Sequence, residues 1–358
     1  MNLTKVEQIA NALLYEGYLL YPYRATAVKN RLRWNFGVVA PQMHSLAKGS
    51  SETWSMKTEC LVLAEPEATL EIKARFLHLM TREVGTLSDK ATTTGSDPET
   101  GVDPRFQVVD SLEVGGELFQ TWQEAVEREV ITPSLSVDKL LGQPLELIFG
   151  FPSRIESEPL HCPDGLLAGL IVRRQRSIRG ALQVSTEQVS DQLFKVVVTI
   201  QNWTSSERAE DQSQEERLMG SLVSAHTILS IESGEFVSLL DPADQYRDAA
   251  QSCCNVGTYP VLAGEEGDRH TMLSSPIILY DYPKIAEESG GDLFDSTEID
   301  EILSLRILTL TDAEKREMRN LDERSRRILE RTETLPPEQM MKLHGVMRSL
   351  GRATTRGQ

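Results

Sequence analysis

Apolar and polar residues alternate along several stretches of the first two thirds of the chain. In residues 70–80 every second side chain is apolar or His78, while Glu71, Lys73 and Arg75 fall on the opposite face. The stretches 178–184 and 194–200 alternate in the same way on either side of a polar turn. A period of two is typical of half-buried strands, so the pattern predicts strands at these places and a hairpin across the turn.

The rest of this region carries similar but shorter signals. Residues 54–84 are predicted to form two strands joined by a turn at Glu65–Glu67, and Gly115–Gly116 marks a further hairpin. Residues 85–104 are predicted to form a loop, and the acid-rich stretch Trp122–Val130 is predicted to form a short helix. The region 54–203 is therefore expected to be an antiparallel sandwich or open barrel.

Helical spacing marks the two ends of the chain. Apolar residues recur at intervals of three and four in residues 3–21, before Pro22. Near the other end, Thr297 and Thr311 each precede an acid by three residues, which is the spacing of a capping box. Met318, Leu321 and Ile328 share one stripe, and a further helix is predicted after Pro337.

These signals together predict an α+β protein. Its central antiparallel β-sandwich-like body is preceded by an N-terminal helix and followed by a C-terminal helical subdomain. The expected divisions are an N-terminal helix with a basic and aromatic arm (1–42), a β-rich body (43–204), a mixed α/β segment (205–283) and a C-terminal helical docking region (284–358).

The charge of the chain narrows the classes of partner. A net charge of −17 would repel a nucleic acid duplex and favours basic partners. No apolar run approaches the ~20 residues that span a bilayer, and the N-terminus lacks the basic start of a signal peptide. A cytoplasmic protein without membrane insertion is therefore expected, and its four cysteines are not expected to form a disulfide framework.

Clusters of reactive or charged side chains offer few candidate sites. Cys253, Cys254 and His270 could supply soft thiolates and an imidazole to a metal ion. Adjacent residues on a helix point about 100° apart, which favours buried or structural cysteines instead. His78 is expected to be a core histidine. The arginines of 173–179 are expected to be solvated or neutralised by the protein's own acids, and binding of an acidic partner is the open alternative. No cofactor and no catalytic residue are expected.

The segment 274–283 is the most distinctive string in the chain. Its apolar strand ends in an aromatic, an acid, an aromatic and a proline, and an acid-rimmed apolar stretch follows from Leu293. Such a surface suits a groove with a basic rim, although packing on the protein's own body is an open alternative. The predicted partner-binding residues are Tyr280, Tyr282, Leu293, Phe294, Ile299, Ile302 and Leu303.

This segment, continued through Asp292–Asp295, Thr297–Ile302 and Leu305–Thr311 to Met318, resembles an uncharacterised bacterial protein family associated with actinobacterial-type [NiFe] hydrogenases. Residues 13–24 are a weaker part of the same resemblance. The resemblance implies an accessory protein in hydrogenase assembly or maturation, with a hydrogenase subunit or maturation factor as partner. It carries no catalytic residues. An enzyme or metal-binding protein with a cryptic Cys/His site, a generic cytoplasmic scaffold and a homo-oligomer stay open.

Overall fold

The computed structural model describes residues 3–16, 36–46, 52–87, 105–205, 213–284 and 300–334. The basic residues at 24–33, most of the predicted loop at 85–104, Thr297 and the helix predicted after Pro337 lie outside this part of the chain.

One very long strand organises the molecule. Strand β1 (Ser55–Leu87) pairs with six other strands, all of them antiparallel. The resulting 12-stranded sheet has the main order β13-β14-β12-β1-β11-β10-β7. Its other members are β2 (Phe106–Val109), β5 (Trp122–Ile131), β6 (Leu135–Ser136), β7 (Leu145–Phe151), β8 (Arg154–His161), β9 (Leu167–Gln175), β10 (Ile178–Gln188), β11 (Leu193–Asn202), β12 (Val223–Val237), β13 (Tyr259–Leu262) and β14 (Thr271–Ser275).

The turn predicted at Glu65–Glu67 is an irregularity inside β1 rather than a break between two strands. The pairing of β1 with β12 continues on both sides, but its register shifts between Ala64 and Thr69. On the facing strand, Ser233 takes a positive φ of 59°. The extra residues can be accommodated because a bulge bends one strand while its partner stays paired.

The antiparallel body is confirmed, whereas its division into a sandwich is not. Twelve of the described strands form one continuous hydrogen-bonded sheet, and β12 to β14, which lie in the segment 205–283, belong to it. The predicted hairpin of β10 with β11 is confirmed. The hairpin at Gly115–Gly116 is also confirmed as β3 (Ser111–Val114) and β4 (Glu117–Gln120), with both glycines at positive φ.

The predicted helix at Trp122–Val130 is wrong, because these residues form β5 along the edge of β1. Acidic residues suit a helix, but here they meet arginines of neighbouring strands: Glu129 pairs with Arg75, and Glu124 pairs with Arg173. Cross-strand pairing of this kind decides the structure of a segment whose own preference is weak.

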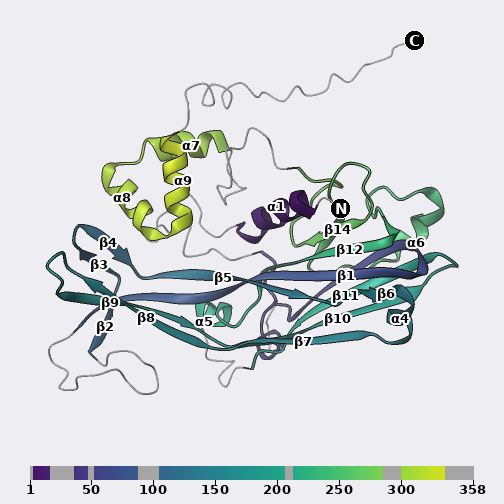
Figure 1. The fold of residues 1–358 in the computed structure, drawn as a ribbon, viewed down its shortest axis with the longest axis horizontal. Helices are drawn as coiled ribbons and strands as arrows, with labels where there is room; N and C mark the ends of the chain where they lie inside the picture. The colour runs from purple at the N-terminus through teal and green to yellow at the C-terminus, as the bar shows by residue number, and fades with distance from the viewer. Residues whose placement is uncertain are drawn as a thin grey trace, which may run out of the picture.

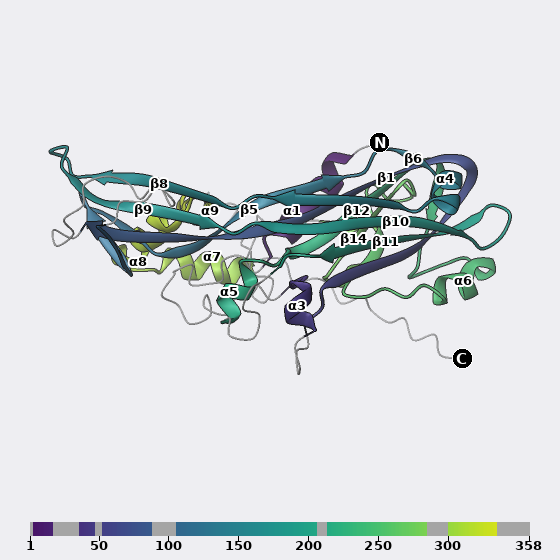
Figure 2. The ribbon, with the colours of Figure 1, turned by 90° about the horizontal axis from the view of Figure 1, so that it is seen from below.

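In Figure 1, α1 and α7 to α9 lie above the long strands β1 and β5, whereas α5 lies below them. Figures 1 and 2 show α7 to α9 toward one end, α4 and α6 at the other end and α1 between them. The helices are α1 (Leu3–Leu14), α3 (Gln42–Ser45), α4 (Val137–Gly142), α5 (Gln214–Leu218), the 3-10 helix η1 (Asp244–Tyr246), α6 (Arg247–Gln251), α7 (Asp300–Leu308), α8 (Asp312–Leu321) and α9 (Glu323–Glu333).

Helix α8 begins at the cap that the sequence predicts. The side chain of Thr311 accepts the N–H of Glu314, whose carboxylate accepts the N–H of Thr311, so the predicted capping box is present. Asp322 caps α9 in a similar way. The predicted stripe is buried against α1, β1 and β12, as Met318, Leu321 and Ile328 belong to one apolar cluster with Leu14 and Leu77.

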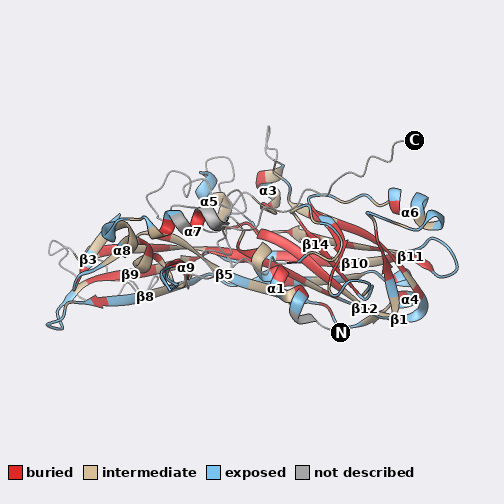
Figure 3. Ribbon diagram, turned by 90° about the horizontal axis from the view of Figure 1, so that it is seen from above, coloured by how far each residue is buried: buried red, intermediate tan, exposed pale blue. Residues whose placement is uncertain are grey.

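The main core lies along the central strands, where buried residues concentrate (Figure 3). It draws on both sides of the β1 irregularity, with Val62 before it and Phe76 after it in the same cluster. Among the described residues, no helix is long and apolar enough to cross a membrane.

Candidate functional site

The distinctive segment after β14 is anchored along the outer edge of β13. The chain leaves β14 at Ser275, which pairs with Tyr259 at the start of β13. It ends at Tyr282, whose N–H donates to the carbonyl of Leu262 at 2.7 Å. The carboxylate of Asp281 accepts the N–H of Leu262 at 2.8 Å and the hydroxyl of Ser238. The segment therefore runs beside β13 and is fixed at both ends.

Side chains of this segment alternate between the protein and solvent. Leu279 packs against an apolar cluster that includes Val6 and Ile9 of α1, and Tyr282 packs against the main core. Ile278 and Tyr280 point the other way and are 73% and 87% exposed. Tyr259, at the beginning of β13, is also exposed. We call Tyr259, Ile278 and Tyr280 the Tyr280 surface.

A small hollow of about 210 Å³ lies beside this surface. Its wall comes from four separate parts of the chain: Phe36 to Val39, Thr53 and Met56, Gly257 and Tyr259, and Pro276. Gly37 has a φ of +52°, and a Cβ there would lie 2.6 Å from Cγ of Pro276. Glycine is thus required where two of these parts meet. The hollow is large enough for one apolar side chain.

The predicted partner-binding residues fall into different places. Tyr280 is exposed, whereas Tyr282 and Leu303 contact the protein's own clusters, and Leu303 is fully buried. Ile302 lies in α7. Leu293, Phe294 and Ile299 lie outside the described residues. Two further exposed residues are absent from that set: Ile278, two residues before Tyr280 on the same segment, and Tyr259, at the start of the strand beside which the segment runs. The one sequence signal that could have identified Tyr259 and Ile278 as binding residues is a large apolar side chain next to the end of a strand.

The cysteines and the histidine of the candidate metal site have other surroundings. Cys253 lies partly buried among Leu61, Leu193 and neighbouring apolar residues, and burial raises its pKa to about 11. Cys254 is exposed. The exposed His270 places Nδ1 2.8 Å from the carboxylate of Asp268. Within the part of the chain that the structure describes, no group of three or more His, Cys, Asp or Glu residues could hold a metal ion.

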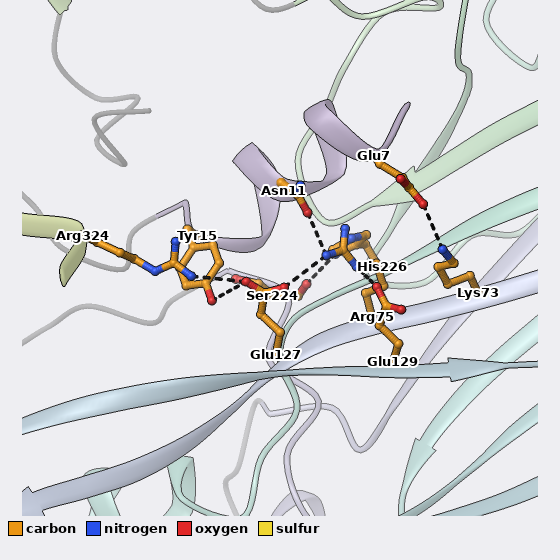
Figure 4. A network of polar contacts seen from close by, with 10 residues as sticks. All are labelled: Glu7, Asn11, Tyr15, Lys73, Arg75, Glu127, Glu129, Ser224, His226 and Arg324. Carbon is orange, nitrogen blue, oxygen red and sulfur yellow. Dashed lines mark hydrogen bonds and ion pairs between the residues drawn. The ribbon is translucent and has the colours of Figure 1, made fainter. Parts of the chain in front are cut away.

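A polar network fastens α1 to the sheet (Figure 4). Its centre is Arg75, a buried residue of β1. Arg75 places Nε 2.9 Å from Glu129 and donates to the side-chain oxygen of Asn11 at 2.8 Å. The same nitrogen, Nη2, that donates to Asn11 also lies 3.5 Å from the carboxylate of Glu127. Two acids from β5 and an amide from α1 thus share one buried cation, which offsets part of its desolvation.

The same network reaches the C-terminal helices. Glu127 accepts the hydroxyl of Tyr15 at 2.7 Å and Nη2 of Arg324 at 3.2 Å. The guanidinium of Arg324 lies over the ring of Tyr15, 3.3 Å from its centroid. Burial and the hydrogen bond to Glu127 raise the pKa of Tyr15 well above its usual value. This tyrosine therefore stays neutral and donates a hydrogen bond at physiological pH.

A strained turn of β12 lies beside the network. Ser224 has a φ of 52°, and its carbonyl lies 2.9 Å from Nδ1 of His226. His226 is fully buried, and burial lowers its pKa to about 4. His78 is also fully buried, as predicted, and its pKa is lowered to about 4 by burial and by the charge of Arg128.

Three arginines of the cluster, Arg173, Arg174 and Arg176, pair with acids of the protein itself. Arg173 binds Glu124 and Glu158, and Arg174 lies 3.1 Å from Glu83. With α5, the strands β8 and β9 line an open groove of about 840 Å³, whose wall contains three arginines and three glutamates. Because these charges already have partners, the groove offers no unbalanced charge to a ligand.

Comparison of the chain with protein-family models, with curated proteins and with solved structures finds no match.

Proposed function

We propose that the protein is a non-enzymatic accessory protein that binds a [NiFe]-hydrogenase subunit or maturation factor through the Tyr280 surface. The observation that carries the proposal is the exposure of Ile278 and Tyr280, 73% and 87%, on a segment that is itself firmly anchored. Large exposed apolar side chains that lie together are typical of sites where another protein binds.

Anchoring makes these side chains suitable for binding. The backbone on either side of Tyr280 is fixed by the packing of Leu279 and by the hydrogen bonds of Asp281 and Tyr282. A partner would therefore lose little free energy in ordering this segment. Tyrosine is also among the residues that most often contribute a large share of the binding free energy.

The chemistry of the surface defines the partner's side of the contact. The hollow beside Tyr259 would accept one apolar side chain. The net charge of −17 favours a partner whose contact surface is basic. The class of partner comes from the resemblance in 274–318, because Ile278 and Tyr280 lie within the same stretch of sequence.

Affinity isolation from the native organism tests this function. The tagged wild-type chain is expected to recover an identified hydrogenase subunit or maturation factor. Ile278→Ser and Tyr280→Ser should each weaken recovery, because loss of a central interface residue costs about 2 kcal/mol, roughly thirtyfold in affinity. Leu166→Ser is the matched control, since Leu166 is 67% exposed in the turn between β8 and β9, which do not pair with β13 or β14.

The proposal is wrong if recovery of the hydrogenase component is unchanged in both surface variants. It is also wrong if the wild-type chain recovers no hydrogenase component from cells that are producing the enzyme.

A further inference from the structure

Strand β7 forms one free edge of the large sheet. It ends the strand order and pairs with β10 alone. In Figure 1 it lies along the lower margin of the molecule. No backbone hydrogen bond joins its outer side to any other residue that the structure describes. The edge of β13, by contrast, is occupied by Asp281 and Tyr282.

The backbone groups that face outward can be identified from the neighbouring strand. Arg179 lies opposite Gly150, and its carbonyl accepts the N–H of Trp203 on the far side of β10. A residue whose backbone bonds on that side makes no bond to the strand on its other side. Gly150 therefore directs its N–H and C=O outward, and so do Ile148 and Glu146 by the alternation of the strand.

These outward groups are self-complementary. If a second β7 approaches antiparallel with Ile148 opposite Ile148, then Glu146 lies opposite Gly150 in both halves. Each of these pairs can exchange two hydrogen bonds, because all of their backbone groups point across the new edge. In the same register Pro144 lies opposite Pro152, so the residues without an N–H fall at the two ends of the paired stretch.

The side chains fit the same register. Ile148 is 50% exposed, and the partly buried Leu145, Leu147 and Phe151 adjoin the main core. Ile148 points to the opposite face of the strand, where pairing would bring the two Ile148 side chains against each other and cover them. Glu146 is the one charged residue of the strand, and its place opposite Gly150 keeps the two like charges apart.

We infer that β7 is the interface of a symmetric homodimer, in which the sheets of two chains join edge to edge through β7. The occupant of this edge is a second copy of the chain. In a twofold pairing centred on Ile148, each outward backbone group of one β7 meets its complement in the other, and the prolines and the glutamate fall where they do no harm.

Light scattering across a dilution series tests the dimer. The wild-type chain is expected to move from twice the chain mass of 40.1 kDa toward that mass as it is diluted. Ile148→Lys places two like charges opposite each other on the twofold axis and should raise the dimer dissociation constant at least about tenfold. Ile131→Lys is the matched control, because Ile131 is 46% exposed at the end of the edge strand β5.

Amide exchange provides a second measurement that needs no variant. The amides of Ile148 and Gly150 should exchange more slowly at high than at low protein concentration. A wild-type chain that keeps the mass of one chain overturns the inference. It is also overturned if Ile148→Lys and Ile131→Lys change the mass equally, or if exchange in β7 is independent of concentration.

Discussion

His226 has no contact with solvent, and its neutral form is the one that the fold accommodates. Burial is the main reason that its pKa is lowered to about 4, and the nearby Arg75 adds to this effect. His78 behaves similarly on β1. Both histidines regain an ordinary pKa, near 6.5, when the chain unfolds. The protons that they bind on unfolding therefore link stability to pH.

The direction of this link follows from the lowered pKa. Well above pH 6.5, His226 is neutral in both the folded and the unfolded state, and its lowered pKa has no effect on stability. As the pH falls from 6.5 toward 4, His226 binds a proton in the unfolded state but stays neutral in the folded state. Stability should fall by up to about 3 kcal/mol for this residue.

Urea unfolding between pH 7 and pH 4.5 measures the effect. His226→Gln should flatten the pH dependence above the range in which carboxylates titrate. His161→Gln, at an exposed position, should leave it unchanged. An equal slope in wild type and His226→Gln would contradict this assignment.

Sequence patterns predicted individual residues unevenly. The burial of His78, Met318 and Leu321 follows from their places in a repeating pattern, and these expectations are confirmed. Tyr280 and Tyr282 occupy similar positions in the sequence, yet Tyr282 packs inward at a φ of 57°. No periodicity signals that reversal, because it depends on the bond between Tyr282 and Leu262.

At the scale of elements, α1 and α9 are joined to β5 through Glu127. The hydroxyl of Tyr15 and the guanidinium of Arg324 both bind this carboxylate. The sequence did not predict that α1 and α9 meet at Glu127, because it predicts a helix for the residues that form β5. Its strand structure depends on β1, which is distant in sequence.

A double-mutant cycle tests how strongly these elements are coupled. Tyr15→Phe and Glu127→Gln should each lower the free energy of unfolding by about 1 kcal/mol, because each weakens the bond between the two side chains. The double variant should lose less than the sum of the single losses. Strict additivity would show that the contact does not join α1 to the sheet.

Tyr246→Phe provides the matched control for the hydroxyl. Tyr246 is also partly buried, and its hydroxyl has no hydrogen-bond partner within the described chain. Its removal should change the free energy of unfolding little. A loss equal to that of Tyr15→Phe would point to a general effect of removing a hydroxyl.

At the scale of the whole molecule, the antiparallel body was predictable because alternation survives in β1, β10 and β11. The single sheet was not, because its continuity depends on which strands share the edges of β1. Pro66 and Ser233–Gly234 are residues typical of turns and therefore indicate strand ends in the sequence. They became irregularities within β1 and β12, because pairing resumes on both sides of them.

The continuity of the sheet also determines where the Tyr280 surface lies. β13 and β14 extend the sheet beyond β12, and the segment that carries Tyr280 lies along the resulting edge. This edge and the β7 edge are at opposite ends of the strand order. A dimer through β7 would therefore leave both copies of the Tyr280 surface free to bind a partner.

Site-specific photo-crosslinking in the native organism tests the binding function most directly. A photoreactive phenylalanine derivative replaces Tyr280 in one strain and Leu166, in the turn between β8 and β9, in another, and mass spectrometry identifies the adducts. The account predicts that position 280 crosslinks to a [NiFe]-hydrogenase subunit or maturation factor and that position 166 does not. It would be contradicted if both positions gave the same adducts, or if position 280 gave none containing a hydrogenase component.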